Sequence, residues 1–316
     1  MRKRDFGSLG QVSALTLGGG GIGQVWGPTT REESVATVRE AVEAGIDFLD
    51  MAPGYGNGEA EFVVGEAFQG RLPQGVRVST KCRLGSPDAG DVAALLETSL
   101  EESLARMKLD SVDLLFLHNM IVPDDAADLY EGTPRSLFGR AARPALEDLR
   151  RRGCIGAWGI TGIGVPDAVI ETLRENPPPA AAQAISNLLD SPGALKRFDA
   201  PARPRDIIAA ASAQGVGVMG IRAVQAGALT DAFDRDLPED HPDMADYRRS
   251  GPFRALAKEV GESPASLAHR YALSMQGVST VVLGVKNRQE LRECIEAEAK
   301  GLLSTDLISR IDALVQ

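Results

Sequence analysis

The sequence is poor in cysteine and in positive charge, and each shortage excludes a class of protein. Its three cysteines lie far apart, are odd in number and show no Cys-x-x-Cys spacing. Neither a disulfide framework nor a zinc site is indicated, and we expect no metal. Lys and Arg number 34 against 44 Asp and Glu, which gives a formal net charge of −10. This charge argues against nucleic acid and anionic membrane surfaces as partners.

Long apolar runs are also missing. No run approaches the ~18 apolar residues of a membrane span, and the basic start, Met1 to Asp5, is not followed by the apolar stretch of a secretion signal. We therefore expect a cytoplasmic protein. No proline-rich linker or shift in composition divides the chain, so we expect residues 1–316 to form one domain.

The sequence does contain a repeated alternation of short apolar strands and amphipathic helices. Strands are predicted at 14–17, 46–50, 76–81, 112–118, 155–160, 181–186, 216–221 and 280–283, and a helix is predicted after each. A hairpin at 5–13 precedes the repeat, and an amphipathic helix at 303–314 follows it. Parallel strand–helix units in this number close a barrel. The predicted fold is therefore α/β, a (β/α)8 TIM barrel with an N-terminal hairpin and a C-terminal extra helix.

Two connections are too long for ordinary loops. About 20 residues separate His118 from a helix predicted at 141–152, and the segment 224–252 precedes a helix predicted at 253–275 with a break near Pro264. Both segments follow strands, so they belong to the face where such barrels keep their sites. We expect them to shape the substrate pocket.

A glycine-rich stretch after the first strand suggests a different fold. Gly18, Gly20 and Gly23 satisfy the Gly-x-Gly-x-x-Gly pattern of a Rossmann dinucleotide site. That site needs its third glycine to open the helix, but here the helix cap comes later, at Thr30. We therefore favour the barrel, in which a glycine-rich loop lets a ligand lie close to the backbone at Gly19 and Gly20.

Ionisable side chains gather at the carboxyl ends of three consecutive strands. They are Asp50 and Tyr55 at the second strand, Lys81 at the third and His118 at the fourth. Neighbouring strands lie about 4.8 Å apart, so these side chains should converge within roughly 10 Å. A nearby ammonium lowers the pKa of a phenol, which is ordinarily about 10, while Asp50 would keep Lys81 charged.

This set describes a general acid for a carbonyl oxygen. Tyr55 would give the proton, and His118 would hydrogen-bond the oxygen or relay a proton. Because no side chain here donates hydride, a nicotinamide cofactor is the economical source of the electrons.

Around these residues the chain resembles the aldo-keto reductase family, over nearly its whole length. Residues 45–56, Gly-Ile-Asp-Phe-Leu-Asp-Met-Ala-Pro-Gly-Tyr-Gly, with Glu61 and Gly65 downstream, are similar to the first family signature. Residues 145–160 resemble the family's fourth helix and fifth strand, and 281–291 resemble the segment that grips the adenosine phosphate. The motifs are specific as a set, although each is weak alone.

The resemblance implies a role for each site residue. The expected catalytic residues are Tyr55 as acid/base with Asp50, Lys81 and His118 around it, and the expected substrate-binding residues are Trp26, Tyr55, His118 and Asn119. The expected cofactor-binding residues are Gly19, Gly20, Asp50, Thr161, Gln183, Ile221, Arg222, Gly284, Lys286 and Arg288.

Departures from the family pattern affect the cofactor. Thr161 and Gly162 replace a common Ser-Asn pair, so the nicotinamide amide is expected on Gln183 and Asn187. The usual aromatic or Ser-Pro-Leu run after the seventh strand is absent. Lys286 falls where the family places a Lys or Arg, so we expect it to bind a 2′-phosphate. NADP(H) is therefore the expected cofactor, with NAD(H) as a second option.

The expected function is reversible reduction of an aldehyde or ketone to an alcohol by hydride transfer from NADP(H). Because Thr161-Gly162 is similar to the sugar-lactone-forming dehydrogenase branch, an NAD-dependent sugar (aldose) dehydrogenase is the alternative. Outside enzymes, the alternative is a cofactor-sensing regulatory subunit with little turnover. The expected partner is a small carbonyl or sugar molecule.

Overall fold

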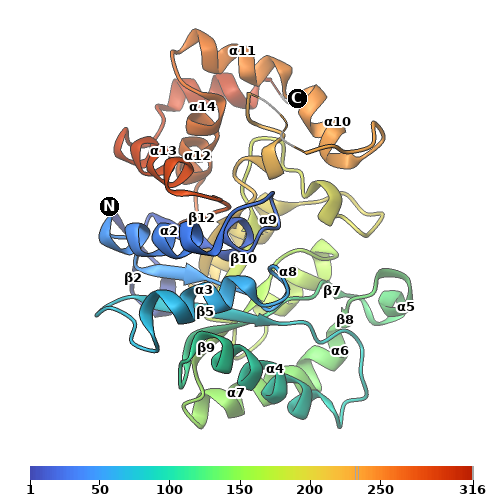
Figure 1. Ribbon diagram of the computed structural model, residues 1–316. Coiled ribbons are helices and arrows are strands. Elements are labelled where there is room, and N and C mark those ends of the chain that lie inside the picture. Colours follow the sequence, from blue (N-terminus) through green and yellow to red (C-terminus); the bar gives the residue numbers. More distant parts are fainter. Residues whose placement is uncertain (232, 234, 315–316) are drawn as a thin grey trace.

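The barrel strands of the computed structural model close into one ring (Figure 1). The structure describes residues 1–231, 233 and 235–314. The strands of the ring are β3 (Leu15–Gly18), β4 (Phe48–Asp50), β5 (Arg77–Cys82), β6 (Val112–Leu117), β9 (Ile155–Thr161), β10 (Ala181–Ile185), β11 (Gly217–Ile221) and β12 (Thr280–Leu283). Each pairs in parallel with the next, and β12 pairs with β3. The predicted eight-stranded parallel barrel is confirmed.

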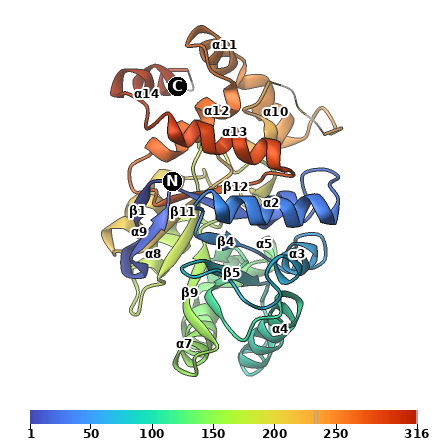
Figure 2. The same ribbon diagram turned by 60° about the vertical axis from the view of Figure 1, so that its left-hand side comes forward.

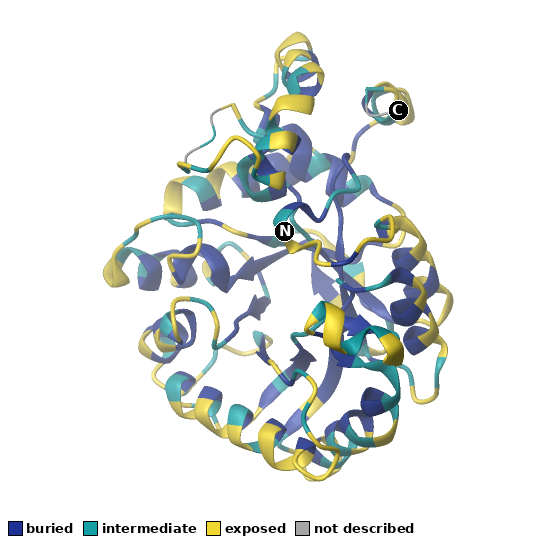
Figure 3. Cartoon of the chain, turned by 90° about the vertical axis from the view of Figure 1, so that its right-hand side faces the viewer, coloured by how far each residue is buried: buried dark blue, intermediate teal, exposed yellow. Residues whose placement is uncertain are grey.

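Helices surround this ring (Figure 2). Those that follow the barrel strands are α2 (Arg31–Glu43), α3 (Glu59–Phe68), α4 (Val92–Met107), α7 (Arg143–Arg151), α8 (Pro166–Arg174), α9 (Pro204–Ala213), α12 (Pro264–Ser274) and α13 (Arg288–Ala299). Further helices are α10 (Pro242–Arg249), α11 (Gly251–Glu259) and the C-terminal α14 (Thr305–Asp312). Figure 3 shows buried residues on the strands and inner helix faces, with exposed residues outside. The predicted extra helix is present.

Local signals set several helix starts as expected. Thr30 accepts a hydrogen bond from the backbone N–H of Glu33 and caps α2. The predicted break near Pro264 separates α11 from α12, because Pro264 occupies the first turn of α12 after a Ser263 cap.

The N-terminal hairpin closes the bottom of the barrel. It consists of β1 (Lys3–Asp5) and β2 (Gln11–Ser13), joined through Phe6 and a short 3-10 turn at Gly7–Leu9. The Phe6 ring packs edge-on against Phe48 of β4, with 5.9 Å between ring centroids. These rings belong to a buried apolar cluster that also includes Val12, Leu114, Phe116, Ala157, Ala181 and Met219. Apolar side chains therefore fill the end of the barrel that the hairpin covers.

The segment after His118 is more ordered than the predicted loop. It contains the short strands β7 (Ile121–Val122) and β8 (Thr133–Pro134) and the turn of helix α5 (Ala127–Tyr130). The next helix does not begin near residue 141. It begins at α6 (Arg135–Leu137) and continues through a π-helical turn (Phe138–Ala142) into α7. Asp124 accepts a hydrogen bond from the N–H of Ser136 at 2.8 Å, so the helix start is fixed by a cap that is remote in sequence.

The glycine stretch is a helical turn, not the loop expected. Gly18 ends β3, and α1 (Gly19–Ile22) follows directly. A Cβ at Gly20 would lie 2.7 Å from the indole nitrogen of Trp26, and one at Gly21 would lie 2.0 Å from the carbonyl oxygen of Val285. The glycines are required because other parts of the chain pack against this turn.

None of the helices in the described part of the chain is long and apolar enough to cross a membrane.

Candidate active site

A buried ion pair lies at the carboxyl end of the barrel. Lys81 is the fifth residue of β5 and Asp50 ends β4, so strand pairing brings them together. The Lys81 Nζ atom lies 2.9 Å from Asp50 Oδ2 and 2.7 Å from the carbonyl oxygen of Met51. The side chains of Lys81 and Asp50 are only 0% and 2% exposed. A pair so buried persists only when hydrogen bonds satisfy its remaining atoms.

Two further side chains hold the Asp50 carboxylate. The Ser79 hydroxyl donates to Asp50 Oδ1 at 2.7 Å, and the Gln183 amide donates to Oδ2 at 2.9 Å. Ser79 was not among the predicted site residues. Its signal is the period of two in a strand, which places Ser79 on the same face of β5 as Lys81. Asp50 is thus held by β5 and, across the barrel mouth, by β10.

Two opposing effects act on the pKa of Lys81. Desolvation lowers the pKa of Lys81, and attraction to the Asp50 carboxylate and to Tyr55 outweighs it, so the net pKa is raised. Lys81 is therefore an ammonium at neutral pH.

Tyr55 lies on the loop after β4 and faces this ammonium. Lys81 Nζ is 4.7 Å from the centroid of the Tyr55 ring. The residue is half-buried, and its hydroxyl is the buried end. Desolvation raises the pKa of Tyr55, and the Lys81 charge counteracts only part of that effect. The expectation of a net lowered pKa is therefore not met, because it counted the neighbouring charge but not the burial of the hydroxyl.

His118 follows β6 and completes the group. Its backbone N–H donates to the carbonyl oxygen of Cys82 at 2.7 Å. Its ring stands edge-on to Tyr55, with centroids 5.9 Å apart and an interplanar angle of 87°. Burial of the ring, aided by the charges of Lys81 and Arg83, lowers the pKa of His118 to about 3. The imidazole is therefore neutral at physiological pH, a form that offers one donor and one acceptor nitrogen.

A buried hydroxyl at the mouth has no partner. Thr161 ends β9, and within the described residues its Oγ1 atom is buried without a hydrogen bond. Thr161 is paired in register with Gln183, the residue that donates to Asp50. A primary carboxamide offers two N–H donors and one acceptor oxygen. The neighbouring Thr161 hydroxyl and Gln183 side chain therefore fit a nicotinamide carboxamide.

Asn187 does not share this task. Its amide nitrogen contacts the carbonyl oxygens of Ser191 and Arg222 and the side chain of Gln225, and its oxygen accepts from the N–H groups of Leu189 and Ser191. The side chain is fully used in shaping the loop after β10. The expectation that Asn187 holds the carboxamide finds no support in these contacts.

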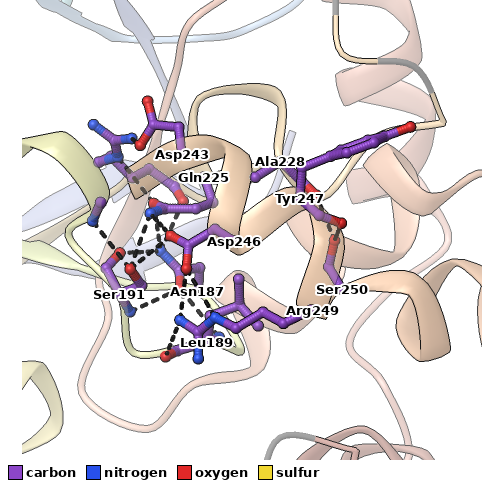
Figure 4. Close-up of polar contacts among 12 residues, drawn as sticks. Asn187, Leu189, Ser191, Gln225, Ala228, Asp243, Asp246, Tyr247, Arg249 and Ser250 are labelled. Carbon is purple, nitrogen blue, oxygen red and sulfur yellow. Dashed lines mark hydrogen bonds and ion pairs between the residues drawn. The ribbon is translucent and has the colours of Figure 1, made fainter. Parts of the chain in front are cut away.

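Helix α10 docks on the same loop through buried polar groups (Figure 4). Asp246 of α10 accepts hydrogen bonds from the Ser191 hydroxyl and the Gln225 amide. Asp243, one turn earlier, accepts from the Arg222 guanidinium at 2.7 Å. Arg222 follows Ile221 at the end of β11, has a positive φ of 59°, and is buried. Sequence reasoning placed Arg222 at the cofactor site but did not foresee its ion pair with Asp243.

The predicted phosphate-binding residues lie between β12 and α13. Lys286 Nζ is 3.4 Å from Glu290 Oε1, and Arg288 pairs with Glu33 of α2 at 2.9 Å. Gly284 precedes them, and a Cβ there would lie 3.0 Å from the indole nitrogen of Trp26.

The predicted substrate residues line two sides of the mouth. Trp26 covers Gly20 and Gly284, and the Arg235 guanidinium stacks on its ring at 5.5 Å from the centroid. Asn119 follows His118, and its side-chain oxygen accepts a hydrogen bond from the N–H of Leu84. The structure thus places Asn119 next to His118 and Trp26 over the glycine turn.

Comparison with known proteins gives a consistent result. The model of the aldo/keto reductase family matches residues 14–316. L-galactose dehydrogenase of Arabidopsis thaliana is 28% identical over 331 residues, covering 99% of this chain and 94% of the relative. D-threo-aldose 1-dehydrogenase of a Pseudomonas species is 30% identical over 315 residues, covering 91% of this chain and 90% of the relative.

A solved structure supports the fold. The aldo-keto reductase from Klebsiella pneumoniae in complex with NADPH superposes with a TM-score of 0.71 at 21% identity, covering 100% of this chain and 96% of that one. Since the family model matches almost the whole sequence, this chain belongs to the aldo/keto reductase family of oxidoreductases.

Proposed function

We propose that this protein reversibly reduces a small aldehyde or ketone to an alcohol with NADP(H), using Tyr55 as the acid/base. The observation that carries the proposal is the buried Asp50–Lys81 pair beneath the Tyr55 ring, with a neutral His118 beside it. The NADPH complex of the Klebsiella relative supports the choice of cofactor.

Each side chain has a definable task in this reaction. A nicotinamide cofactor, when bound, supplies hydride to the carbonyl carbon. Tyr55 gives its proton to the carbonyl oxygen, which becomes the alcohol, and is left as a phenolate. The Lys81 ammonium stabilises that phenolate, and Asp50 keeps Lys81 charged and aimed. His118 hydrogen-bonds the oxygen and fixes its position.

The cofactor would lie across the mouth from β9 to α13. Thr161 and Gln183 would hold the nicotinamide carboxamide, since one has an unpartnered hydroxyl and the other lies beside it. Lys286 and Arg288 would hold the 2′-phosphate near the start of α13. The remaining backbone and side-chain contacts would come from Gly19, Gly20, Ile221, Arg222 and Gly284.

A second candidate is an NAD-dependent sugar dehydrogenase. Two relatives, L-galactose dehydrogenase and D-threo-aldose 1-dehydrogenase, are named as sugar dehydrogenases. Thr161-Gly162, which stands where the family commonly has Ser-Asn, is similar to the sugar-lactone-forming dehydrogenase branch. The same four catalytic side chains would serve, with Tyr55 accepting the proton from a sugar hydroxyl.

Two experiments test the proposal. Steady oxidation of NADPH by 4-nitrobenzaldehyde supports the reductase, and steady reduction of NAD by a free sugar supports the dehydrogenase. Tight cofactor binding with negligible turnover of either kind would instead indicate a cofactor sensor.

The Tyr55→Phe variant then tests the mechanism. We expect kcat to fall by about 100-fold or more, with the cofactor dissociation constant near normal. Tyr130→Phe, which alters a half-buried tyrosine at the end of α5 whose hydroxyl donates to Asp199, is the matched control. Appreciable residual kcat in Tyr55→Phe would contradict the assignment.

A further inference from the structure

Arg83 projects from the chain immediately beside the catalytic group. It follows Cys82, the last residue of β5, and lies two residues beyond Lys81. The Cys82 carbonyl accepts from the N–H of His118, and the N–H of Leu84 donates to the Asn119 side chain. The residues on both sides of Arg83 are therefore bonded to the His118–Asn119 pair.

Strand register gives the same placement. Cys82 is paired with Leu117 in the β5–β6 ladder, so Arg83 continues the register opposite His118. Paired residues on neighbouring strands lie about 5 Å apart. Arg83 is thus fixed at the rim of the site by backbone pairing.

Arg83 is also exposed and lacks an acidic partner. In contrast, Arg222 is held by Asp243, and Arg288 is held by Glu33. Within the described residues, no carboxylate forms an ion pair with Arg83, although the chain as a whole has an excess of acidic residues. An exposed guanidinium at the rim is therefore left with its hydrogen-bond donors directed to solvent.

The charge of Arg83 acts on the catalytic residues. Desolvation is the largest influence on the pKa of both Tyr55 and His118, and the positive charges of Lys81 and then Arg83 lower both pKa values. The strand register, which sets Arg83 opposite His118, accounts for this influence.

We propose that Arg83 binds an anionic group of the substrate, so that the preferred substrate is a carbonyl or hydroxyl compound that also carries a carboxylate or a phosphate. This inference rests on the proposed oxidoreductase function. Guanidinium donors match the planar carboxylate and the phosphate oxygens and bind them through paired hydrogen bonds. An anion held by Arg83 would orient the substrate with its reacting oxygen toward Tyr55 and His118.

A matched pair of aldehydes tests the proposal. 4-Carboxybenzaldehyde carries a carboxylate, and 4-nitrobenzaldehyde carries an uncharged group of similar shape at the same position. We expect Arg83→Gln to lower the ratio of kcat/KM for 4-carboxybenzaldehyde to kcat/KM for 4-nitrobenzaldehyde by about ten-fold or more. Arg83→Lys should retain part of the preference because it keeps the charge.

Arg71→Gln is the matched control for charge. Arg71 is also an exposed arginine, but it lies in the connection between α3 and β5, at the opposite end of the barrel. We expect Arg71→Gln to leave kcat/KM unchanged for both aldehydes. A second pair, glyceraldehyde 3-phosphate and glyceraldehyde, distinguishes phosphate from carboxylate recognition, and an Arg83-dependent preference in either pair supports the inference.

Measuring the binding of product alcohols tests anion recognition by Arg83 independently of turnover. With protein saturated by NADPH, 4-(hydroxymethyl)benzoate and 4-nitrobenzyl alcohol form dead-end complexes that can be titrated by calorimetry. If no aldehyde is turned over but 4-(hydroxymethyl)benzoate binds more tightly than 4-nitrobenzyl alcohol, and Arg83→Gln removes that difference, the proposed function fails while anion binding by Arg83 is retained. If Arg83→Gln lowers kcat/KM equally for the charged and the uncharged member of each pair and also shifts the pH profile, Arg83 acts by changing the pKa of Tyr55. That result would overturn anion recognition. If neither turnover nor binding favours the charged member of a pair, the proposal that Arg83 binds an anionic group is also overturned.

Discussion

The Lys81 ammonium and the Asp50 carboxylate lie 2.9 Å apart with almost no exposure to solvent. Removal of one partner from such a pair leaves a buried charge without compensation. We therefore expect Asp50→Asn to lower the free energy of unfolding at pH 7 on the order of 3–5 kcal/mol. Because the net pKa of Lys81 is raised in the folded state, the pair's contribution is fully present at pH 7 and is lost only as pH rises through that raised value.

Urea denaturation measures this loss. The control is Glu40→Gln, which breaks the surface pair of Glu40 with Arg292 and should cost less than about 1 kcal/mol. Equal effects of the two variants would mean that burial of the Asp50–Lys81 pair has no energetic consequence.

Because the Thr161 hydroxyl has no partner within the described residues, removing it should weaken cofactor binding without destabilising the free protein. Thr161→Val removes a buried hydroxyl that has no hydrogen bond within the described chain, so the free protein should be as stable or slightly more stable. If the hydroxyl holds the carboxamide, cofactor affinity should fall about ten-fold.

Ser186→Ala is the matched control for this variant. Ser186 Oγ is likewise buried without a partner among the described residues, and it is not expected to bind cofactor. Fluorescence titration with NADPH and thermal unfolding measure the two effects. Unchanged affinity in Thr161→Val would remove Thr161 from the cofactor site.

Lys286 is predicted to discriminate between the two nicotinamide cofactors. We expect Lys286→Ala to weaken NADPH binding about ten-fold or more while leaving NADH binding unchanged, because only NADPH carries the 2′-phosphate. Arg292→Ala, farther along α13 and paired with Glu40 on the surface, is the control. Equal weakening of both cofactors by Lys286→Ala would show that the residue does not bind the 2′-phosphate.

His118 gives the protein an acid-sensitive component of stability. Its folded pKa of about 3 lies below its ordinary value of 6.5. Between these values the unfolded chain binds a proton that the folded chain does not, so stability is lost as pH falls and is fully present above pH 6.5. The loss between pH 7 and pH 5 should be on the order of 2 kcal/mol.

His118→Asn should remove that part of the pH dependence. Urea denaturation of both proteins at about pH 7 and pH 5 measures the difference. The same pH dependence in the variant and the unaltered protein would show that the imidazole titrates normally.

The barrel and the clustering of Asp50, Lys81 and His118 are predictable from sequence because they depend on local patterns. Most of the barrel strands are short apolar runs, and their carboxyl ends follow from the first polar residue or glycine after each run. Parallel pairing then brings Asp50, Lys81 and His118 to one edge. These predictions need no knowledge of how the loops fold.

What sequence reasoning missed depends on contacts between distant segments. The pairing of Arg222 with Asp243 depends on where α10 docks, and that position is set by buried polar groups on three segments. The raised pKa of Tyr55 depends on burial of its hydroxyl, which no residue spacing reports. The cap that starts the helix at Arg135 comes from Asp124, outside the helix itself.

The pairing of β3 with β12 has a consequence for how the chain is made. Leu15 pairs with Val281, so the first barrel strand cannot meet its last neighbour until the ribosome has synthesised nearly the entire chain. At typical elongation speeds that interval is on the order of ten seconds or more. Throughout it, one edge of the nascent sheet stays open to pairing with other chains.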